Sequence, residues 1–217
     1  MSKCIIIAPL SRGEEPAWLC REDGDLLICA DGGYAAARRC GLEPDLVVGD
    51  FDSMPEGHQV QGEVLRLPVH KDDTDMAVCF LEGRKRGYRS FRIAGALGGR
   101  MDHTLANLQC LYDCALRGEE AWLCDRHNRL TVLLPGEYVI SRIPERKLSL
   151  LAWTQEVRGV TLRGTEWELT DHTLSSRYPL GVSNEIRGEQ AHLSFTEGAL
   201  VLIHAQDAAA DRSDDNT

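Results

Sequence analysis

From Met1 to Leu134, hydrophobic residues alternate between short continuous runs and stretches with a helical period. The continuous runs predict strands at Cys4–Ala8, Asp25–Ala30, Pro44–Val48, Val64–Leu67, Phe91–Ala94 and Ala121–Cys124. The stretches between them predict helices at Tyr34–Cys40, Thr74–Arg86 and His103–Arg117, and a glycine follows each of the three. Strands that alternate with helices are typical of a sheet with helices on its faces.

Two of the predicted helices carry apolar residues on one face, which we expect to pack against the sheet. On the second helix these residues are Met76, Cys79, Phe80 and Gly83. On the third helix they are Leu105, Leu108, Tyr112 and Leu116.

After Pro135-Gly136 the helical period disappears and the pattern predicts only strands. They are expected at Tyr138–Ile143, Leu148–Trp153, Val160–Leu162, Trp167–Leu169, Ala191–Phe195 and Leu200–Ala205. Short strands at close spacing are typical of a small sandwich or barrel. The predicted fold class is therefore α/β, with an N-terminal Rossmann-like three-layer domain (1–137) followed by a smaller all-β sandwich domain (138–205). Residues 206–217 contain no bulky apolar side chain and predict a disordered tail.

Composition excludes several classes of protein. A net charge of −10 argues against non-specific binding to nucleic acid, which needs clusters of Lys and Arg. No segment is long and apolar enough for a membrane span, and the apolar start lacks the flanks of a secretory signal. The chain has eight cysteines but no C-x-x-C pair, so buried thiols of a reducing compartment are expected. We therefore predict a cytoplasmic location.

Carboxylates follow two neighbouring apolar runs. Asp50 and Asp52 come after the predicted strand that ends at Val48, and Asp72 and Asp75 come after the next strand. In open α/β sheets, ligands bind beyond the carboxyl ends of the strands. Carboxylates gathered there repel one another unless a divalent cation lies among them, and oxygen ligands favour Mg²⁺ over zinc. The pattern predicts metal-assisted phosphate chemistry, with Lys71 as a positive charge on phosphate.

Structural roles are the alternative for several of these acids, although capping does not explain Asp50 and Asp52. Asp72 or Asp73 is a candidate N-cap of the following helix, Asp75 suits its dipole, and Asp52-Ser53 suits a turn. Magnesium takes only one or two carboxylates directly, so not every aspartate is expected to be a ligand.

Two glycine-containing loops are candidate phosphate sites. Asp31-Gly32-Gly33 joins a predicted strand to a helix, where the alternative is a tight turn with Asp31 as the cap. The stretch from Gly95 to His103 combines three glycines with Arg100 before a helix, which favours phosphate binding by backbone N–H groups and a guanidinium. Asp102 there either caps the helix or faces the ligand. His103 is expected to be a hydrogen-bonding group beside the site rather than a general base.

In the β-rich part, Trp167 lies between polar neighbours. A single Trp in a strand is usually part of the core, but one that faces outward offers a stacking surface for a flat or cationic heterocycle. Ser183-Asn184 supplies compact hydrogen-bonding groups in a loop.

Together these segments resemble the thiamine pyrophosphokinase (thiamine diphosphokinase) family. The resemblance rests on Gly49-Asp50-Phe51-Asp52-Ser53 and Lys71-Asp72-Asp73-Thr74-Asp75. It extends to Asp31-Gly32-Gly33, to Gly98–His103 with Asn107, and more loosely to Trp167 with Ser183-Asn184. These motifs occur in the family's order and cover most of positions 1 to 205.

The resemblance implies transfer of pyrophosphate from ATP to the hydroxyl of thiamine, giving thiamine diphosphate and AMP, by a homodimer with active sites between its subunits. It assigns Mg²⁺ and catalysis to Asp50, Asp52, Asp72 and Asp75, with Lys71. It assigns the ATP site to Asp31, Gly32, Gly33, Ser53, Gly98, Gly99, Arg100, Asp102, His103 and Asn107. It assigns thiamine to Trp167, Ser183 and Asn184.

Our candidate for the proton acceptor is Asp75 or Asp72, because both lie at the helix start. A Mg²⁺-dependent phosphohydrolase is a second hypothesis, in which water replaces the alcohol. A nucleotide- or thiamine-binding regulator without catalysis is a third.

Overall fold

The computed structural model describes residues 2–10, 20–50, 62–68 and 74–207. Most of the predicted tail, 208–217, therefore lies outside the described residues. The N-terminal elements are β1 (Cys4–Ile7), β2 (Leu26–Ala30), α1 (Gly33–Arg39), β3 (Leu46–Gly49), β4 (Glu63–Arg66), α2 (Asp75–Lys85), β5 (Ser90–Ala94), α3 (Met101–Leu116) and β6 (Glu120–Cys124). The C-terminal elements are β7 (Asn128–Leu133), β8 (Gly136–Ser141), β9 (Lys147–Ala152), β10 (Glu156–Arg163), β11 (Leu169–Ser175), β12 (Gln190–Phe195) and β13 (Leu200–Ala205).

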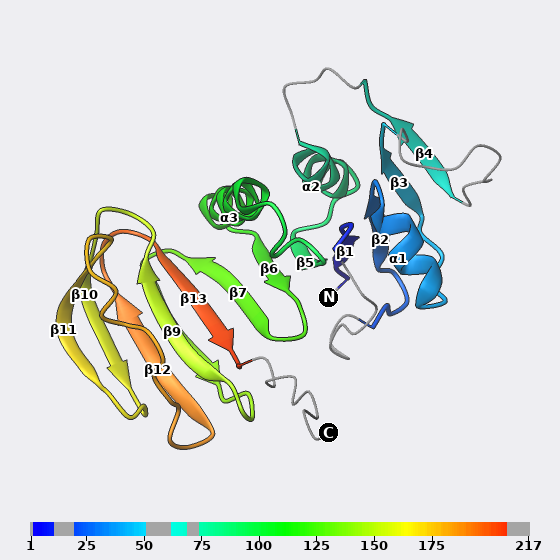
Figure 1. Cartoon of the computed structure of the whole chain (residues 1–217). Helices are drawn as coiled ribbons and strands as arrows, with labels where there is room; N and C mark the ends of the chain where they lie inside the picture. Colours follow the sequence, from blue (N-terminus) through cyan, green and yellow to red (C-terminus); the bar gives the residue numbers. More distant parts are fainter. Residues whose placement is uncertain (1, 11–19, 51–61, 69–73, 208–217) are drawn as a thin grey trace, which may run out of the picture.

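The strands form two sheets. The larger has the order β4-β3-β2-β1-β5-β6-β7-β13-β9; its neighbours are parallel from β4 to β6 and antiparallel from β6 onward (Figure 1). The smaller sheet is antiparallel, with the order β11-β10-β12-β8. The predicted α/β class with a second, β-rich part is confirmed.

Both faces of the large sheet are covered. α2 and α3 pack on one face, against a core that includes Ile6, Ile28 and Leu123. α1 covers the other face at β1 and β2, where Ile5 and Leu27 pack against it. Strands buried on both faces need continuous apolar runs rather than alternation, which explains their sequence pattern.

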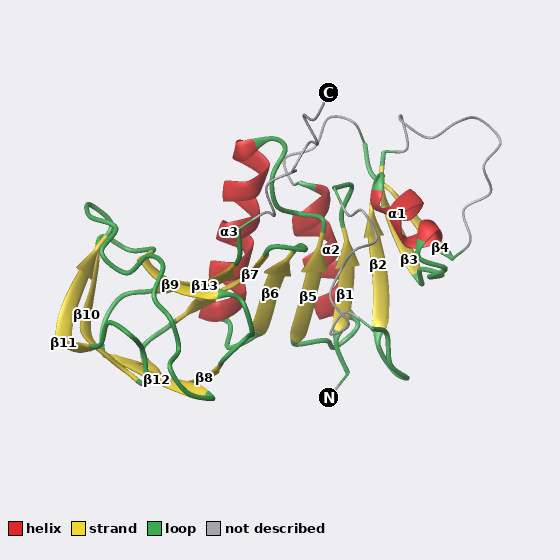
Figure 2. Ribbon diagram, turned by 60° about the horizontal axis from the view of Figure 1, so that its bottom comes forward, coloured by secondary structure: helices red, strands yellow, loops and turns green. Residues whose placement is uncertain are grey.

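The small sheet covers the same face as α1, at the opposite end of the large sheet (Figure 2). Leu200 and Leu202 of β13 point into the sandwich between the sheets, while Val201 points to the α3 side. Because successive side chains of a strand point to opposite faces, β13 contributes to two separate cores.

The large sheet runs across the predicted boundary at 137/138. β13 pairs with β7 on one side and with β9 on the other. The second part therefore supplies two strands to the same sheet that carries the N-terminal elements, and the boundary stays a prediction.

Several predicted details are wrong. β7 was assigned no element by the sequence pattern. The predicted strand at Trp167–Leu169 begins only at Leu169, so Trp167 lies in the connection between β10 and β11. On α3, Leu105 and Leu116 are exposed, whereas Leu108 and Tyr112 are partly buried and pack against the core as predicted. The buried side chains are Asn107, Leu111 and Cys114. The predicted inner face of α2 is confirmed.

All eight cysteines are free thiols, but Cys20 and Cys40 are exposed rather than buried. In the part of the chain that the structure describes, no helix combines the length and the apolar character needed to cross a membrane.

Candidate active site

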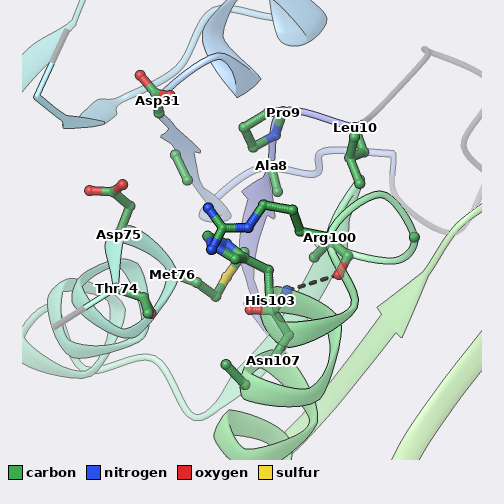
Figure 3. A pocket seen from close by; sticks show the side chains of 15 residues that line it. Ala8, Pro9, Leu10, Asp31, Thr74, Asp75, Met76, Arg100, His103 and Asn107 are labelled. Atoms are coloured by element: carbon green, nitrogen blue, oxygen red, sulfur yellow. Dashed lines mark hydrogen bonds between the residues drawn. The ribbon is translucent and has the colours of Figure 1, made fainter. Parts of the chain in front are cut away.

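A cavity of about 440 Å³ lies where β1, β2 and β5 end at one edge of the large sheet (Figure 3). From β1 the sheet grows through β2, β3 and β4 in one direction and through β5 and β6 in the other. This change of direction is where ligands bind in open parallel sheets. The first turns of α2 and α3 form the other walls. The lining residues are Ala8, Pro9, Leu10, Ala30, Asp31, Thr74, Asp75, Met76, Gly95, Ala96, Gly98, Arg100, His103, Ala106 and Asn107.

The loop after β5 is held in shape by α3. Gly95, Gly98 and Gly99 have φ values of 70°, 84° and 62°, a conformation that glycine adopts without the strain a side chain would cause. The side chain of Asn107 donates from Nδ2 to the carbonyl of Ala96 at 2.8 Å. The backbone N–H of Gly98 donates to Oγ1 of Thr104 at 3.2 Å. These bonds place the loop against the N-terminus of α3, where backbone N–H groups favour anions.

Arg100 and Asp102 form an exposed ion pair at the start of α3. Nη2 of Arg100 donates to Oδ2 of Asp102 at 2.6 Å, and the backbone N–H of His103 donates to Oδ1 at 2.9 Å. The hydrogen bond from Arg100 lowers the pKa of Asp102 to about 2. The N-cap position belongs to Arg100, so Asp102 is not the cap. Its predicted contact with a ligand stays a prediction.

Asp31 and Asp75 approach the cavity from different elements. Asp31 follows β2 with a φ of 44°, and Asp75 is the first residue of α2; Figure 3 shows both side chains at one side of the cavity. The N-cap of α1 is Gly32, without a side-chain hydrogen bond, so Asp31 is not a cap. The N-cap of α2 is Thr74, whose Oγ1 accepts from the backbone N–H of Ala77 at 3.2 Å. The capping roles considered for Asp31, Asp72 and Asp73 are therefore wrong.

Asp50 directly follows β3, whose last residue, Gly49, lies beside Asp31. β3 pairs with β2, and the backbone N–H of Asp31 donates to the carbonyl of Val48 at 2.7 Å. Carboxylate oxygens from Asp31, Asp50 and Asp75 at one sheet edge are the donor type that Mg²⁺ prefers. The described residues therefore fit a magnesium ion by chemistry, although they contain no cluster of three acidic or other ligands close enough to hold one by themselves.

Four predicted site residues, Asp52, Ser53, Lys71 and Asp72, lie outside the described residues. The predicted metal site depends on two of them, so its composition stays a prediction.

Gly33 has a packing reason for being glycine. A Cβ atom at this position would lie 2.0 Å from the carbonyl oxygen of Ile7, so α1 can approach β1 only without a side chain here. Neither Gly33 nor Gly32 lines the cavity, and their predicted part in ATP binding stays a prediction.

Trp167 lies away from this cavity, on the turn between β10 and β11, and its side chain is 60% exposed. The buried side chain of Asn184 holds the turn. Its Oδ1 accepts from the backbone N–H of Trp167 at 3.1 Å, and its Nδ2 donates to the carbonyl of Trp167 at 2.7 Å. Oδ1 also accepts from the backbone N–H of Glu185. Asn184 therefore uses both of its side-chain polar atoms to position Trp167. A direct contact between Asn184 and a ligand would have to use these same atoms.

Ser183, beside Asn184, has a φ of 64°, and its backbone N–H donates to Oγ of Ser149 at 3.0 Å. The structure therefore brings Trp167, Ser183 and Asn184 together, but not with the cavity.

Sequence reasoning missed the apolar wall of the cavity. Ala8, Pro9 and Leu10 come directly after β1, and Met76 comes from the first turn of α2. The position of the first segment, after the central strand, was the available signal, because all parallel strands end at the same edge.

Comparison with known proteins gives the family. A model described as "Thiamin pyrophosphokinase, catalytic domain" matches residues 19–123, and one described as "Thiamin pyrophosphokinase, vitamin B1 binding domain" matches residues 137–200. The chain belongs to the thiamine pyrophosphokinase family. The predicted membership is confirmed.

Individual relatives match over nearly the whole chain. Thiamine pyrophosphokinase of Bacillus subtilis is 28% identical over 192 residues, covering 86% of this chain and 90% of the relative. A crystal structure of thiamine pyrophosphokinase from Bacillus subtilis matches with a TM-score of 0.85 at 26% identity, covering 96% of this chain and 100% of the other. A family member from Enterococcus faecalis matches with a TM-score of 0.82 at 29% identity, covering 95% and 100%.

The two thiamine pyrophosphokinase matches divide the candidate residues between them. The catalytic-domain match contains every cavity residue except Ala8, Pro9 and Leu10, and the vitamin B1-binding match contains Trp167, Ser183 and Asn184. The phosphohydrolase alternative has no support from these comparisons.

Proposed function

We propose that this chain transfers the pyrophosphoryl group of ATP to the hydroxyl of thiamine, releasing thiamine diphosphate and AMP. The observation that carries this proposal is that the family's catalytic-domain match contains most of the residues that line the cavity at the switch point of the sheet. Attack of an alcohol on phosphorus needs alignment and charge neutralisation more than a covalent nucleophile. The cavity offers groups for both.

The polyphosphate of ATP is proposed to lie against the Gly95–Gly99 loop and the N-terminus of α3. The backbone N–H groups and the positive end of the helix dipole favour an anion at this position. Arg100 has the planar donor geometry for phosphate oxygens, but its guanidinium binds Asp102 in the ligand-free protein. Phosphate binding therefore requires Arg100 to exchange or share this partner.

Asp50, Asp52, Asp72 and Asp75 are proposed to hold Mg²⁺, with Lys71 as a charge on phosphate. When bound, the ion neutralises phosphate oxygens and orients the polyphosphate. Asp75, which lines the cavity, or Asp72 is proposed to accept the proton of the thiamine hydroxyl.

Thiamine is proposed to stack on Trp167 of a second copy of the chain. All cavity residues come from positions 8–107, whereas Trp167 is exposed on the small sheet and fixed by Asn184. An exposed aromatic ring on a fixed backbone is suited to a flat cationic ligand. A homodimer would bring this ring to the partner's cavity. The free thiols of all eight cysteines support a reducing, cytoplasmic location.

The test is incubation of the purified chain with ATP, Mg²⁺ and thiamine, followed by identification of products. We expect thiamine diphosphate and AMP in equal amounts, and none without Mg²⁺. ADP with thiamine monophosphate would indicate a simple kinase. Phosphate or AMP released without thiamine would indicate a hydrolase, and binding without any product would indicate a regulator.

A further inference from the structure

A second cavity of about 230 Å³ lies at the side of the sandwich, lined by residues from β8 of the small sheet and from β7 and β13 of the large one. Most of its wall is apolar, with Leu133, Ile140 and Leu202 from the three strands. Two basic side chains, Arg129 and His204, line it as well. None of its residues belongs to the cavity assigned above to ATP.

Arg129 and His204 are direct neighbours across two strands. His204 of β13 pairs with Arg129 of β7 in the antiparallel register, so both side chains project from the same face of the sheet. The guanidinium carbon of Arg129 lies 4.1 Å from the centre of the Trp122 ring. Nε1 of Trp122 donates to Glu120 at 2.9 Å, which holds the ring in place. The basic end of the cavity is thus built on fixed side chains.

His204 is buried in a positively charged environment. It is 4% exposed, and no hydrogen bond joins its ring to any other residue of the described chain. Burial, with the nearby charges of Arg129 and Arg146, lowers its pKa to about 4. The ring is therefore neutral at pH 7, with one N–H donor and one acceptor nitrogen, and the residue lines the cavity.

The carboxylates close to this cluster already have partners. Glu120 accepts from Arg92 and Trp122, and Asp125 accepts from the backbone N–H groups of His127 and Asn128. His204 lines the cavity, and its ring has no hydrogen-bond partner among the described residues, so an anion at this end of the cavity would give its N–H an acceptor.

We propose that this cavity binds a small organic carboxylate with an apolar body. The carboxylate would accept from Arg129 and His204, and the body would lie between Leu133, Ile140 and Leu202. The volume is below the roughly 300–1,000 Å³ of typical ligand pockets, so the ligand is of about the size of benzoate. An inorganic anion would leave the apolar wall without a partner, and a neutral apolar molecule would leave the ring N–H of His204 without an acceptor.

The test uses benzoate, benzyl alcohol and inorganic phosphate as probes on the full chain, in buffers without carboxylates. Calorimetry gives the affinities, and the indole N–H signal of Trp122 in ¹⁵N NMR spectra reports the location. We expect saturable benzoate binding that shifts the Trp122 signal, with benzyl alcohol and phosphate each at least about tenfold weaker.

The variant Arg129→Gln should weaken benzoate binding by about tenfold or more, because it removes a charged hydrogen bond. The control variant Arg158→Gln, on an exposed part of β10, should leave the affinity unchanged. Equal binding of benzyl alcohol, equal or tighter binding of phosphate, an unshifted Trp122 signal, or no benzoate binding would each overturn the proposal. These readouts on the unmodified chain hold even if Arg129→Gln fails to fold.

Discussion

At the scale of single residues, the carboxylates decide what the cavity at the edge of the large sheet can do. Asp31 and Asp75 come from segments far apart in the chain and line one side of it, and Thr74 rather than an aspartate caps α2. The N-caps of α1 and α2 are Gly32 and Thr74, so helix capping does not explain the aspartates near these two helix starts. The proposed chemistry of the cavity depends on Asp75 more than on any other described carboxylate.

Replacing Asp75 by Asn tests that dependence. If Asp75 accepts the proton of the thiamine hydroxyl, kcat for thiamine diphosphate formation should fall by about 10²–10⁴-fold, the usual contribution of a positioned base. The matched control Asp23→Asn changes an exposed acid in the turn before β2, at the opposite end of that strand, and should keep normal kcat. Near-normal turnover of Asp75→Asn with unchanged Mg²⁺ affinity would contradict the role.

The sequence predicted which residue types reach the cavity better than how they pair. Arg100 and Asp102 were each expected at a ligand, but their bond to one another depends on backbone geometry that spacing alone does not define. Gly33 was predicted as a ligand contact because glycine suits phosphate, whereas the fold needs it for the approach of α1 to Ile7. The same residue type serves both purposes, so composition could not separate them.

At the scale of elements, the connection between β10 and β11 acts as a rigid support for one aromatic ring. Asn184 comes from a distant loop that also pairs with Leu148 at the edge of β9. Its amide bonds both backbone groups of Trp167. The position of the ring is therefore set by the loop at Asn184 and not by a strand.

Two variants distinguish the role of Asn184, which holds the turn, from that of Trp167, which is proposed to contact thiamine. Asn184→Ala should lower the free energy of unfolding by about 1–3 kcal/mol, because it leaves partly buried backbone groups unsatisfied, and should raise KM for thiamine. Trp167→Ala should raise KM for thiamine about tenfold and leave stability nearly unchanged, because the ring is exposed. Urea unfolding and steady-state kinetics measure both. A loss of stability in Asn184→Ala with an unchanged KM would show that this turn is not part of the thiamine site.

The bounds of strands with continuous apolar runs were predicted to within a few residues. A short run of this kind fits a strand that is buried on both faces of a sheet. β7 was missed because Arg129 and Thr131 interrupt its apolar residues, although the fold places Thr131 in the interior, where its hydroxyl donates to the carbonyl of Ala121. The predicted face of α3 was only half right: Leu108 and Tyr112 pack against the core, but the fold also buries Asn107 and Cys114 and exposes Leu105 and Leu116. Buried polar side chains with one specific partner are invisible to a hydrophobic pattern.

At the scale of the whole molecule, the two sets of candidate residues are separated within one chain. The cavity uses residues 8–107, and Trp167 is carried by the small sheet. The hydrophobic pattern could not predict the strand order that separates them. That order depends on the pairing of β7 with β13, which is far from it in the sequence. The proposed homodimer with shared sites would join them.

Mixing two defective chains tests the shared site. Asp75→Asn chains and Trp167→Ala chains, refolded together, should form mixed dimers in half of the cases, with one intact site each. At low thiamine concentration the mixture should then recover about a quarter of normal activity, whereas each chain alone stays low. Mixed dimers without recovered activity would contradict a site built from two subunits.

Acid should destabilise the protein through His204. Its pKa in the folded protein is about 4, below the usual 6.5, so between these values only the unfolded chain takes up the proton. This contribution to stability is complete above pH 6.5 and falls by about 3 kcal/mol as the pH decreases to 4.

Urea unfolding at several pH values should show a smaller loss of stability in His204→Leu than in the unmodified chain. The exposed histidine variant His192→Gln should keep the full loss, and equal slopes in all three proteins would contradict this explanation.

The position of β13 also bears on how the chain is made. Among the described strands it is the last to be synthesised, yet it lies between β7 and β9 in the finished sheet. Until it arrives, both neighbours have an edge without a partner, and unpaired edges invite pairing with other chains. The sheet can close only after synthesis has reached Ala205, so a nascent chain that stalls shortly before this residue should be the form most prone to aggregation.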